Sequence, residues 1–230
     1  MAIQGWPNRS VTALCLPLDK VASMLTPHRI VARLVFAVLA KLLRYLAAVL
    51  LSLSLLACTP SLDLKGMDIS DKAMGGDFTL TDHTGQARSL AGFKGKAVAL
   101  FFGYTHCPDV CPTTMLEYAE AMKVLGAEAD KVQVLFVSVD PQRDTRQVLA
   151  GYVPHFDPRF LGLTGSAAAI DKVKAQYQIV AQKVPASGGS YTVDHSAGSY
   201  LFDRQGKLRV YEAYGTPSTV LAHDLRELLR

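Results

Sequence analysis

Two predominantly apolar runs constrain the fold of this chain more than any other feature. They are Ala97–Phe102 and Val132–Val139, and an apolar run of this length is typical of a strand buried on both faces of a sheet. Between them, Met115, Tyr118 and Met122 recur at the spacing of one helix face. A buried strand, a helix and a second buried strand indicate an α/β domain.

The pattern that follows completes this domain. Further strands are predicted at Phe78–Thr81, Leu161–Thr164, Ile179–Val184, Gly198–Asp203 and Leu208–Tyr214. Helices are predicted after Asp144, Ser166 and Thr216, whose side chains can accept hydrogen bonds from the first helical amides, and Pro217 suits the first position of the last helix. This order of elements is that of a thioredoxin-like α/β domain. Residues 185–190 (PASGGS) are either a mobile loop or only the tip of a hairpin.

The N-terminal part has the features of an export signal. The segment just before Tyr45–Ala57, an uncharged stretch of 13 residues, contains four basic residues; they are Arg29, Arg33, Lys41 and Arg44. A basic lead and a short apolar stretch before a small residue describe a secretory signal, and the stretch is shorter than the roughly 20 residues of a spanning helix. The following Leu55-Leu56-Ala57-Cys58 resembles the lipobox of bacterial lipoproteins, which implies cleavage before Cys58 and lipid on its sulfur. The alternative is an uncleaved helix from about Val31 that spans the membrane.

These features predict three parts of the chain. Residues 1–57 form a leader and lipoprotein signal, 58–72 a tether that begins with Thr59-Pro60-Ser61, and 73–230 the thioredoxin-like domain. Residues 1–23 show no periodicity and precede a second methionine, Met24, so they are interpreted as a mis-called gene start. The predicted mature protein is anchored to a membrane and faces the periplasm.

The charge of the chain is concentrated in the leader. Residues 1–57 contain six of the 24 Lys and Arg residues but one of the 20 Asp and Glu residues, which leaves the remainder with a formal charge near −1. The net charge of +4 therefore gives no support to nucleic-acid binding.

A cysteine pair directly after the first apolar run is the strongest functional signal. Of four cysteines, only Cys107 and Cys111 fall in the folded part, which is too few for a structural disulfide framework. Pro108 and Pro112 place Cys111 in the first turn of a helix, where free amides favour a thiolate. Two close thiolates need a cation or a disulfide to resolve their charge. The pair is therefore either a metal site or a redox site.

A later histidine can complete a metal site. His195 follows Asp194, which either orients the imidazole ring or faces solvent. Two thiolates and one imidazole suit copper, especially Cu(I). The other histidines are interpreted as structural or exposed; they are His83, His106, His155 and His223.

Three motifs in this order resemble the SCO/SenC family, which comprises copper chaperones for cytochrome c oxidase. They are GYTHCPDVCP at 103–112, VSVDPQRDT at 137–145 and VDHS at 193–196, and the resemblance extends from about residue 73 to the C-terminus. It implies a thioredoxin-like fold with a central mixed sheet, flanking helices and an added β-hairpin. The chain departs from the family at Thr114, where an acidic residue is frequent, and in its lipobox, where many members keep a spanning helix.

The resemblance also implies a function. Cys107, Cys111 and His195 are the expected copper ligands, and Asp194 supports the histidine or faces a partner. The expected activity is delivery of copper to the CuA centre of cytochrome c oxidase subunit II. A second copper chaperone or a thiol reductase in the periplasm is a further expected partner.

A thiol–disulfide oxidoreductase is the alternative function. It would use a reversible Cys107–Cys111 disulfide to keep the acceptor's cysteines reduced or to act in redox signalling. The spacing is against it, since thioredoxin-like enzymes use CxxC, and residues 192–196 lack the proline that such enzymes place opposite the thiols. A peroxidase is less consistent still, because the Thr-x-x-Cys pattern of that family is absent.

Overall fold

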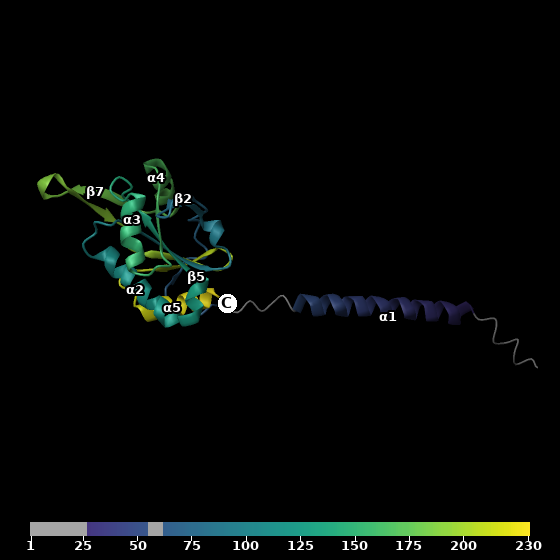
Figure 1. Ribbon diagram of the computed structural model, residues 1–230. Helices are drawn as coiled ribbons and strands as arrows, with labels where there is room; N and C mark the ends of the chain where they lie inside the picture. The colour runs from purple at the N-terminus through teal and green to yellow at the C-terminus, as the bar shows by residue number, and fades with distance from the viewer. Residues whose placement is uncertain (1–26, 55–61) are drawn as a thin grey trace, which may run out of the picture. The chain divides into compact units, whose positions relative to one another are not determined.

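The computed structural model describes residues 27–54 and 62–230, which fall in two compact units divided at Pro60 and Ser61. The first unit contains one described helix, α1 (Pro27–Ser54; Figure 1). Among the described residues, no helix is both long enough and apolar enough to cross a membrane. Cys58 and residues 1–23, on which the lipidation and gene-start predictions depend, lie outside the described residues.

The second unit is built on a mixed sheet in the order β1-β10-β9-β4-β5-β6-β2-β3. The strands are β1 (Met67–Asp68), β2 (Thr79–Asp82), β3 (Ala87–Ser89), β4 (Ala97–Gly103), β5 (Val132–Ser138), β6 (Leu161–Thr164), β9 (Ser199–Phe202) and β10 (Leu208–Glu212). β4, β5 and β6 are parallel, and the other pairs are antiparallel. The predicted α/β thioredoxin-like fold with a central mixed sheet is confirmed.

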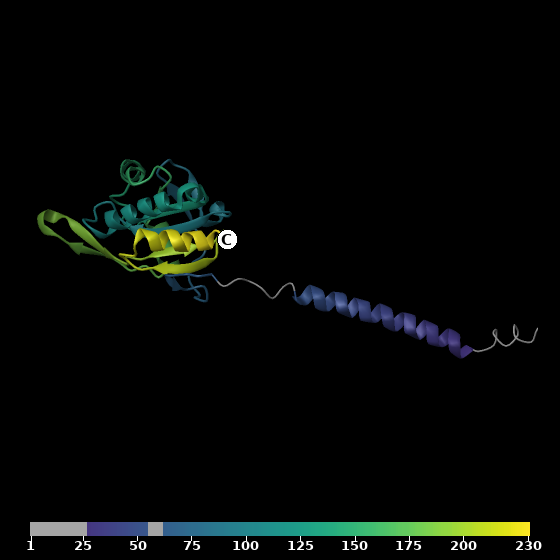
Figure 2. The same ribbon diagram turned by 90° about the horizontal axis from the view of Figure 1, so that it is seen from below.

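Helices and short 3₁₀ turns flank this sheet. The helices are α2 (Val110–Leu125), α3 (Arg146–Tyr152), α4 (Ala167–Gln176) and α5 (Ser218–Leu228); the turns are η1 (Leu90–Phe93), η2 (Gly126–Lys131) and η3 (Val153–His155). α2 and α5 lie side by side (Figure 2), and α3 packs against β6. Gly126 ends α2 with a positive φ of 58°, as its position after the periodic residues predicts.

The two apolar runs form the centre of the core. Every residue of β4 and β5 is buried, as expected for parallel strands covered by helices. Phe101 and Phe136 pack ring to ring between the two strands at 5.7 Å, and Phe102 contacts Tyr177 and Tyr200.

Two of the predicted helix caps are wrong. Thr145, not Asp144, begins α3 by accepting a hydrogen bond from Val148 N–H, because the Asp144 carboxylate is buried and accepts hydrogen bonds from Thr105 and Ser138 instead. Thr216 does not cap α5, since its hydroxyl donates to the carbonyl oxygen of Ala213 at 2.9 Å. Ser166 caps α4 as predicted.

An added β-hairpin extends from the body of the domain (Figures 1 and 2). Its strands β7 (Ala181–Pro185) and β8 (Tyr191–His195) are antiparallel and form a sheet of their own. The segment 185–190 is the hairpin tip, where the short turn η4 (Ser187–Gly189) contains two glycines at positive φ. The expected hairpin is therefore present, and its last residue is His195.

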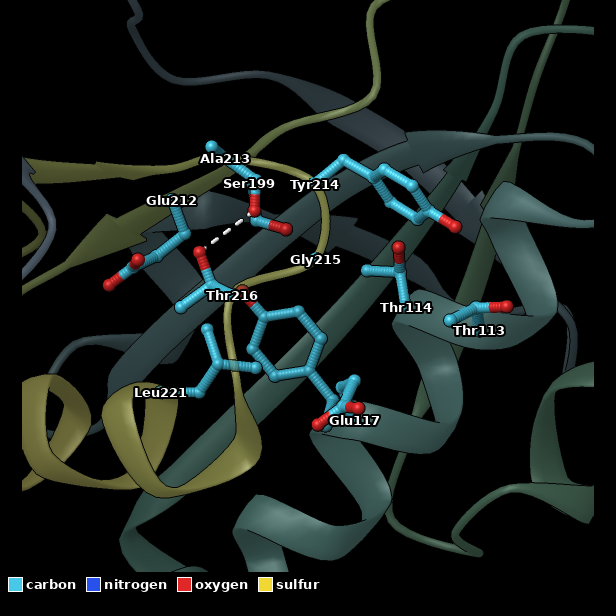
Figure 3. A pocket seen from close by; sticks show the side chains of 11 residues that line it. Thr113, Thr114, Glu117, Ser199, Glu212, Ala213, Tyr214, Gly215, Thr216 and Leu221 are labelled. Carbon is cyan, nitrogen blue, oxygen red and sulfur yellow. Dashed lines mark hydrogen bonds between the residues drawn. The ribbon is translucent and has the colours of Figure 1, made fainter.

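A small polar pocket lies between α2 and the loop that joins β10 to α5 (Figure 3). Glu212, which contributes to its lining, is buried beside Asp224. Burial and the neighbouring carboxylate raise the pKa of Glu212 to about 8. The Asp224 carboxylate accepts hydrogen bonds from the backbone N–H groups of Lys65 and Gly66, at 2.9 and 2.8 Å. With its raised pKa, Glu212 carries a proton at neutral pH.

This proton makes the stability of the domain depend on pH. Between about pH 4.5 and 8 the folded state holds a proton on Glu212 that the unfolded state has lost, so the free energy of unfolding falls as the pH rises through this range. Glu212→Gln mimics the protonated acid. At pH 8.5 we expect the free energy of unfolding of Glu212→Gln to exceed that of the unsubstituted protein by at least about 1 kcal/mol, since one pKa unit corresponds to about 1.4 kcal/mol.

Denaturant unfolding between pH 5 and 9 measures the effect. The exposed Glu120 provides the control, because Glu120→Gln should leave the pH profile unchanged. Parallel profiles for Glu212→Gln and the unsubstituted protein would contradict the assignment.

Candidate metal centre

The end of β4 delivers the cysteine pair. Tyr104, directly after the strand, is buried. The following turn is closed by a hydrogen bond of 3.3 Å from the N–H of Cys107 to the carbonyl oxygen of Tyr104. Cys111 then lies in the first turn of α2, as predicted. A Cβ atom at Gly103 would come within 2.8 Å of the Cys111 sulfur, so glycine at this position allows the thiol to pack over the strand end.

A buried carboxylate fixes the loop between β4 and the cysteines. Asp144 accepts hydrogen bonds from the N–H of Thr105 at 3.1 Å and from its hydroxyl at 2.6 Å. It also accepts one from Ser138 Oγ at 2.7 Å. This role differs from the helix cap predicted for Asp144 from its residue type and position. The loop that carries the cysteines is thereby tied to the end of β5.

His195 is brought to the cysteines from the end of β8. Its Nε2 atom lies 3.4 Å from the Cys111 sulfur, and the potential ligand atoms of Cys107, Cys111 and His195 all lie within 4.8 Å of one another. The Nδ1 atom donates to the carbonyl oxygen of Ser196 at 2.8 Å. A proton on Nδ1 leaves the lone pair of Nε2 directed at the thiols, as in a histidine that binds a metal.

Burial keeps Cys111 and His195 uncharged when no metal is present. It raises the pKa of the Cys111 thiol, and the nearby Cys107 raises it further. Burial also lowers the pKa of His195, which keeps the imidazole neutral at pH 7. The expectation that helix amides make Cys111 a thiolate is therefore wrong for the metal-free site, because the loss of hydration outweighs the helix dipole. A bound cation reverses this balance by displacing the thiol proton.

The other histidines lie away from the thiols. His106 and His155 are exposed, His83 accepts a hydrogen bond from Gly162 N–H, and His223 donates to the carbonyl oxygen of Asp63. They are structural or exposed, as predicted. Asp194 is exposed beside the site.

Each thiol meets a different environment. Cys111 is fully buried, whereas Cys107 is partly exposed. Cys107 lines an open cleft whose other walls are the start of α2 and the end of β8; the remaining lining residues are Tyr104, Pro108, Asp109, Val110, Thr192, Val193, Asp194, His195 and Ala197. Both thiols are free in the structure. Cys107 and His195 thus face this cleft, whereas Cys111 is covered.

A thioredoxin-like domain in which a CxxxC pair lies beside a histidine of an added hairpin belongs to the class of proteins that bind a soft metal ion or use a cysteine pair for redox chemistry. The model of the family SCO1/SenC matches residues 67–230. The chain belongs to the SCO1/SenC family, in agreement with the resemblance of its three motifs.

Relatives and solved structures give the same result. The chain is 44% identical over 154 residues to "Protein SCO2 homolog, mitochondrial" of Bos taurus, an alignment that covers 66% of this chain and 58% of the relative. The structure of Bradyrhizobium japonicum ScoI with copper bound shares 45% identity and a TM-score of 0.64, covering 68% of this chain and 99% of that one. A SCO1/SenC family lipoprotein from Bacillus anthracis shares 25% identity and a TM-score of 0.60, covering 73% and 99%.

The unequal burial of the thiols predicts unequal reactivity. In reduced, metal-free protein at pH 8, iodoacetamide should alkylate Cys107 faster than Cys111, because Cys111 is buried and its pKa is raised. Fragmentation of the peptide 97–123 in a mass spectrometer resolves the two sites over time. Equal rates, or faster reaction at Cys111, would show that the site opens more than the structure indicates.

Proposed function

We propose that this protein binds one copper ion through Cys107, Cys111 and His195. The observation that carries the proposal is the convergence of two sulfur atoms and one imidazole nitrogen within 4.8 Å. Thiolate and imidazole are the ligands that favour copper over harder cations. The copper-bound state of Bradyrhizobium japonicum ScoI supports the same choice of metal.

We further propose that the copper is cargo for the CuA centre of cytochrome c oxidase subunit II. The family resemblance supports this acceptor, and the geometry supports transfer in general. The partly exposed Cys107 opens to the cleft, so acceptor thiolates can attack the copper from that side while Cys111 and His195 still hold it. A second periplasmic copper chaperone, or a thiol reductase that keeps the pair reduced, is the proposed source of metal or electrons.

We propose that residues 1–57 are a leader and that a lipid on Cys58 anchors the domain facing the periplasm. The lipobox-like sequence supports this arrangement, as does the lipoprotein from Bacillus anthracis in the same family. The tether predicted at 58–72 ends before β1, because Met67 and Asp68 pair with β10 in the main sheet. We expect mass spectrometry of the membrane fraction to find a mature chain that begins at lipid-modified Cys58, and Cys58→Ala to block processing. A membrane-bound chain that still contains Lys41 would favour an uncleaved anchor.

The rival function is reduction of the acceptor's cysteines by the Cys107–Cys111 pair. The thioredoxin-like fold and the accessible Cys107 support it. A dithiol reductase does not need an imidazole nitrogen 3.4 Å from one of its thiols, which is the feature that favours the copper proposal.

Removal of any one ligand should weaken copper binding severely. Loss of a residue that only supports a metal ligand typically costs about 10–100-fold in affinity. We therefore expect Cys107→Ser, Cys111→Ser and His195→Ala each to raise the dissociation constant for Cu(I) by more than about 100-fold. Competition with a chromophoric Cu(I) chelator, on anaerobically reduced protein, measures the constant and the stoichiometry.

The neighbouring His106 provides the matched control for this experiment. It is exposed and adjoins Cys107, but it lies outside the group of three. His106→Ala should keep one copper per chain with unchanged affinity. Full retention of copper by His195→Ala would refute the three-ligand site.

Complementation separates the chaperone from the reductase. In a strain that lacks this gene and has a defective oxidase, His195→Ala should fail to restore oxidase activity, as Cys107→Ser fails. Excess copper in the medium should partly rescue both by supplying the acceptor directly. If His195→Ala complements fully and added copper does nothing, the protein acts on thiols and the copper proposal is wrong.

A further inference from the structure

The hairpin that carries His195 stands apart from the main sheet. Within residues 62–230, β7 and β8 pair only with each other. At the base of the hairpin, Val180 and Ser196 exchange hydrogen bonds of 3.0 and 3.1 Å, and Val193 is buried in the core. The position of His195 relative to the cysteines therefore depends on side-chain contacts between the hairpin and the body.

Arg143, in the loop after β5, makes the most extensive of these contacts. Its Nη1 donates to the carbonyl oxygen of Tyr191 at 2.8 Å, and its guanidinium carbon lies 3.6 Å from the centre of the Tyr191 ring. Its Nε pairs with Asp140, which also accepts a hydrogen bond from the Tyr191 hydroxyl at 2.9 Å. Arg143, Asp140 and Tyr191 thus each contact the other two, and together they join the loop to the first residue of β8.

The same guanidinium group also reaches the metal centre. It lies 5.6 Å from the centre of the Tyr104 ring, and Tyr104 packs edge-to-face against the His195 imidazole at 5.7 Å and 86°. Tyr104 is buried between the cysteine loop and the hairpin. A continuous series of contacts between planar groups therefore connects Tyr191 through Arg143 and Tyr104 to His195.

We propose that Arg143 is a positioning residue for the metal centre: it clamps the hairpin to the body so that His195 stays beside the cysteine thiols. This inference rests on the proposed copper function, and it assigns a role to a residue of the 137–145 motif that binds no metal. The motif then supports the site through Arg143 and Asp140, with Tyr104 between Arg143 and His195 in the series of contacts.

The contacts require an arginine. A planar guanidinium can stack on one ring while its edge donates to a carbonyl oxygen and a carboxylate, whereas a lysine ammonium is a point charge on a flexible stem. Lys183 illustrates the difference. Its ammonium group lies 4.3 Å from the centre of the same Tyr191 ring. The side chain is nevertheless exposed, and its one hydrogen bond is to Gln142.

The test compares two arginine-to-lysine variants of the full chain. Arg143→Lys should raise the dissociation constant for Cu(I) by about 10–100-fold, the range typical of residues that support a metal ligand. The matched control is Arg159→Lys, which disrupts a similar loop pair, Arg159 with Asp157 at 2.7 Å, that does not contact the hairpin. The control should leave copper affinity unchanged.

A second comparison shows whether Arg143 acts through His195. In a His195→Ala background, Arg143→Lys should cause no further loss of copper affinity, because the ligand that it positions is already absent. Thermal unfolding of the metal-free proteins shows whether each variant folds. If Arg143→Lys does not fold, Tyr191→Leu and Tyr191→Phe replace it: Tyr191→Leu should weaken copper binding and Tyr191→Phe, which keeps the ring, should weaken it less.

Two results would overturn the proposed clamp. The first is unchanged copper affinity in Arg143→Lys, or in Tyr191→Leu where that variant replaces it. The second is an equal loss of copper affinity on Arg143→Lys substitution in the presence and in the absence of His195. Both differ from failure of the proposed function, in which His195→Ala itself would bind copper as the unsubstituted protein does.

Discussion

The parallel pairing of β4 with β5 is the constraint on which the rest of the site depends. Gly103 and Ser138, the last residues of the two strands, are direct partners in the register. The cysteine loop and the 139–145 loop therefore leave the sheet at the same edge, where Asp144 joins Thr105 to Ser138. Because both strands are fully buried, a slip of register would disrupt the core and the site together. The geometry of the thiols is thus set by the hydrophobic core.

Features that depend on the local sequence pattern could be predicted from the sequence. Apolar runs identified β4 and β5, helical spacing identified α2, and the cysteine and histidine motifs identified the three residues that the fold brings together. The cap predicted at Thr216 failed for a local reason, a hydrogen bond to Ala213 three residues earlier, but the failures near the site occurred where a polar side chain had a distant partner. Asp144 has the residue type of a helix cap, but its partner Thr105 is 39 positions away, and the clamp between Arg143 and Tyr191 joins residues 48 positions apart. Local pattern does not encode such contacts.

Electrostatics at the site were also beyond sequence reasoning. A helix start favours a thiolate, yet Cys111 is fully buried and its pKa is raised. In the metal-free site Cys111 is therefore a neutral thiol and His195 a neutral imidazole, and binding of copper must displace the Cys111 proton. These neutral groups avoid burying uncompensated charge while the site is empty, and they present soft ligands once a cation is present. This arrangement suits a carrier, which must remain folded with and without its cargo.

The central claim is that His195 completes a three-ligand copper site with the two thiols. X-ray absorption at the copper edge of the anaerobically loaded, full-length protein tests it most directly, because it counts the sulfur and nitrogen neighbours of the metal. We expect two sulfur neighbours and one imidazole nitrogen, with the characteristic outer-shell scattering of the imidazole ring missing in His195→Ala. A site with two sulfurs alone in the unsubstituted protein would contradict it.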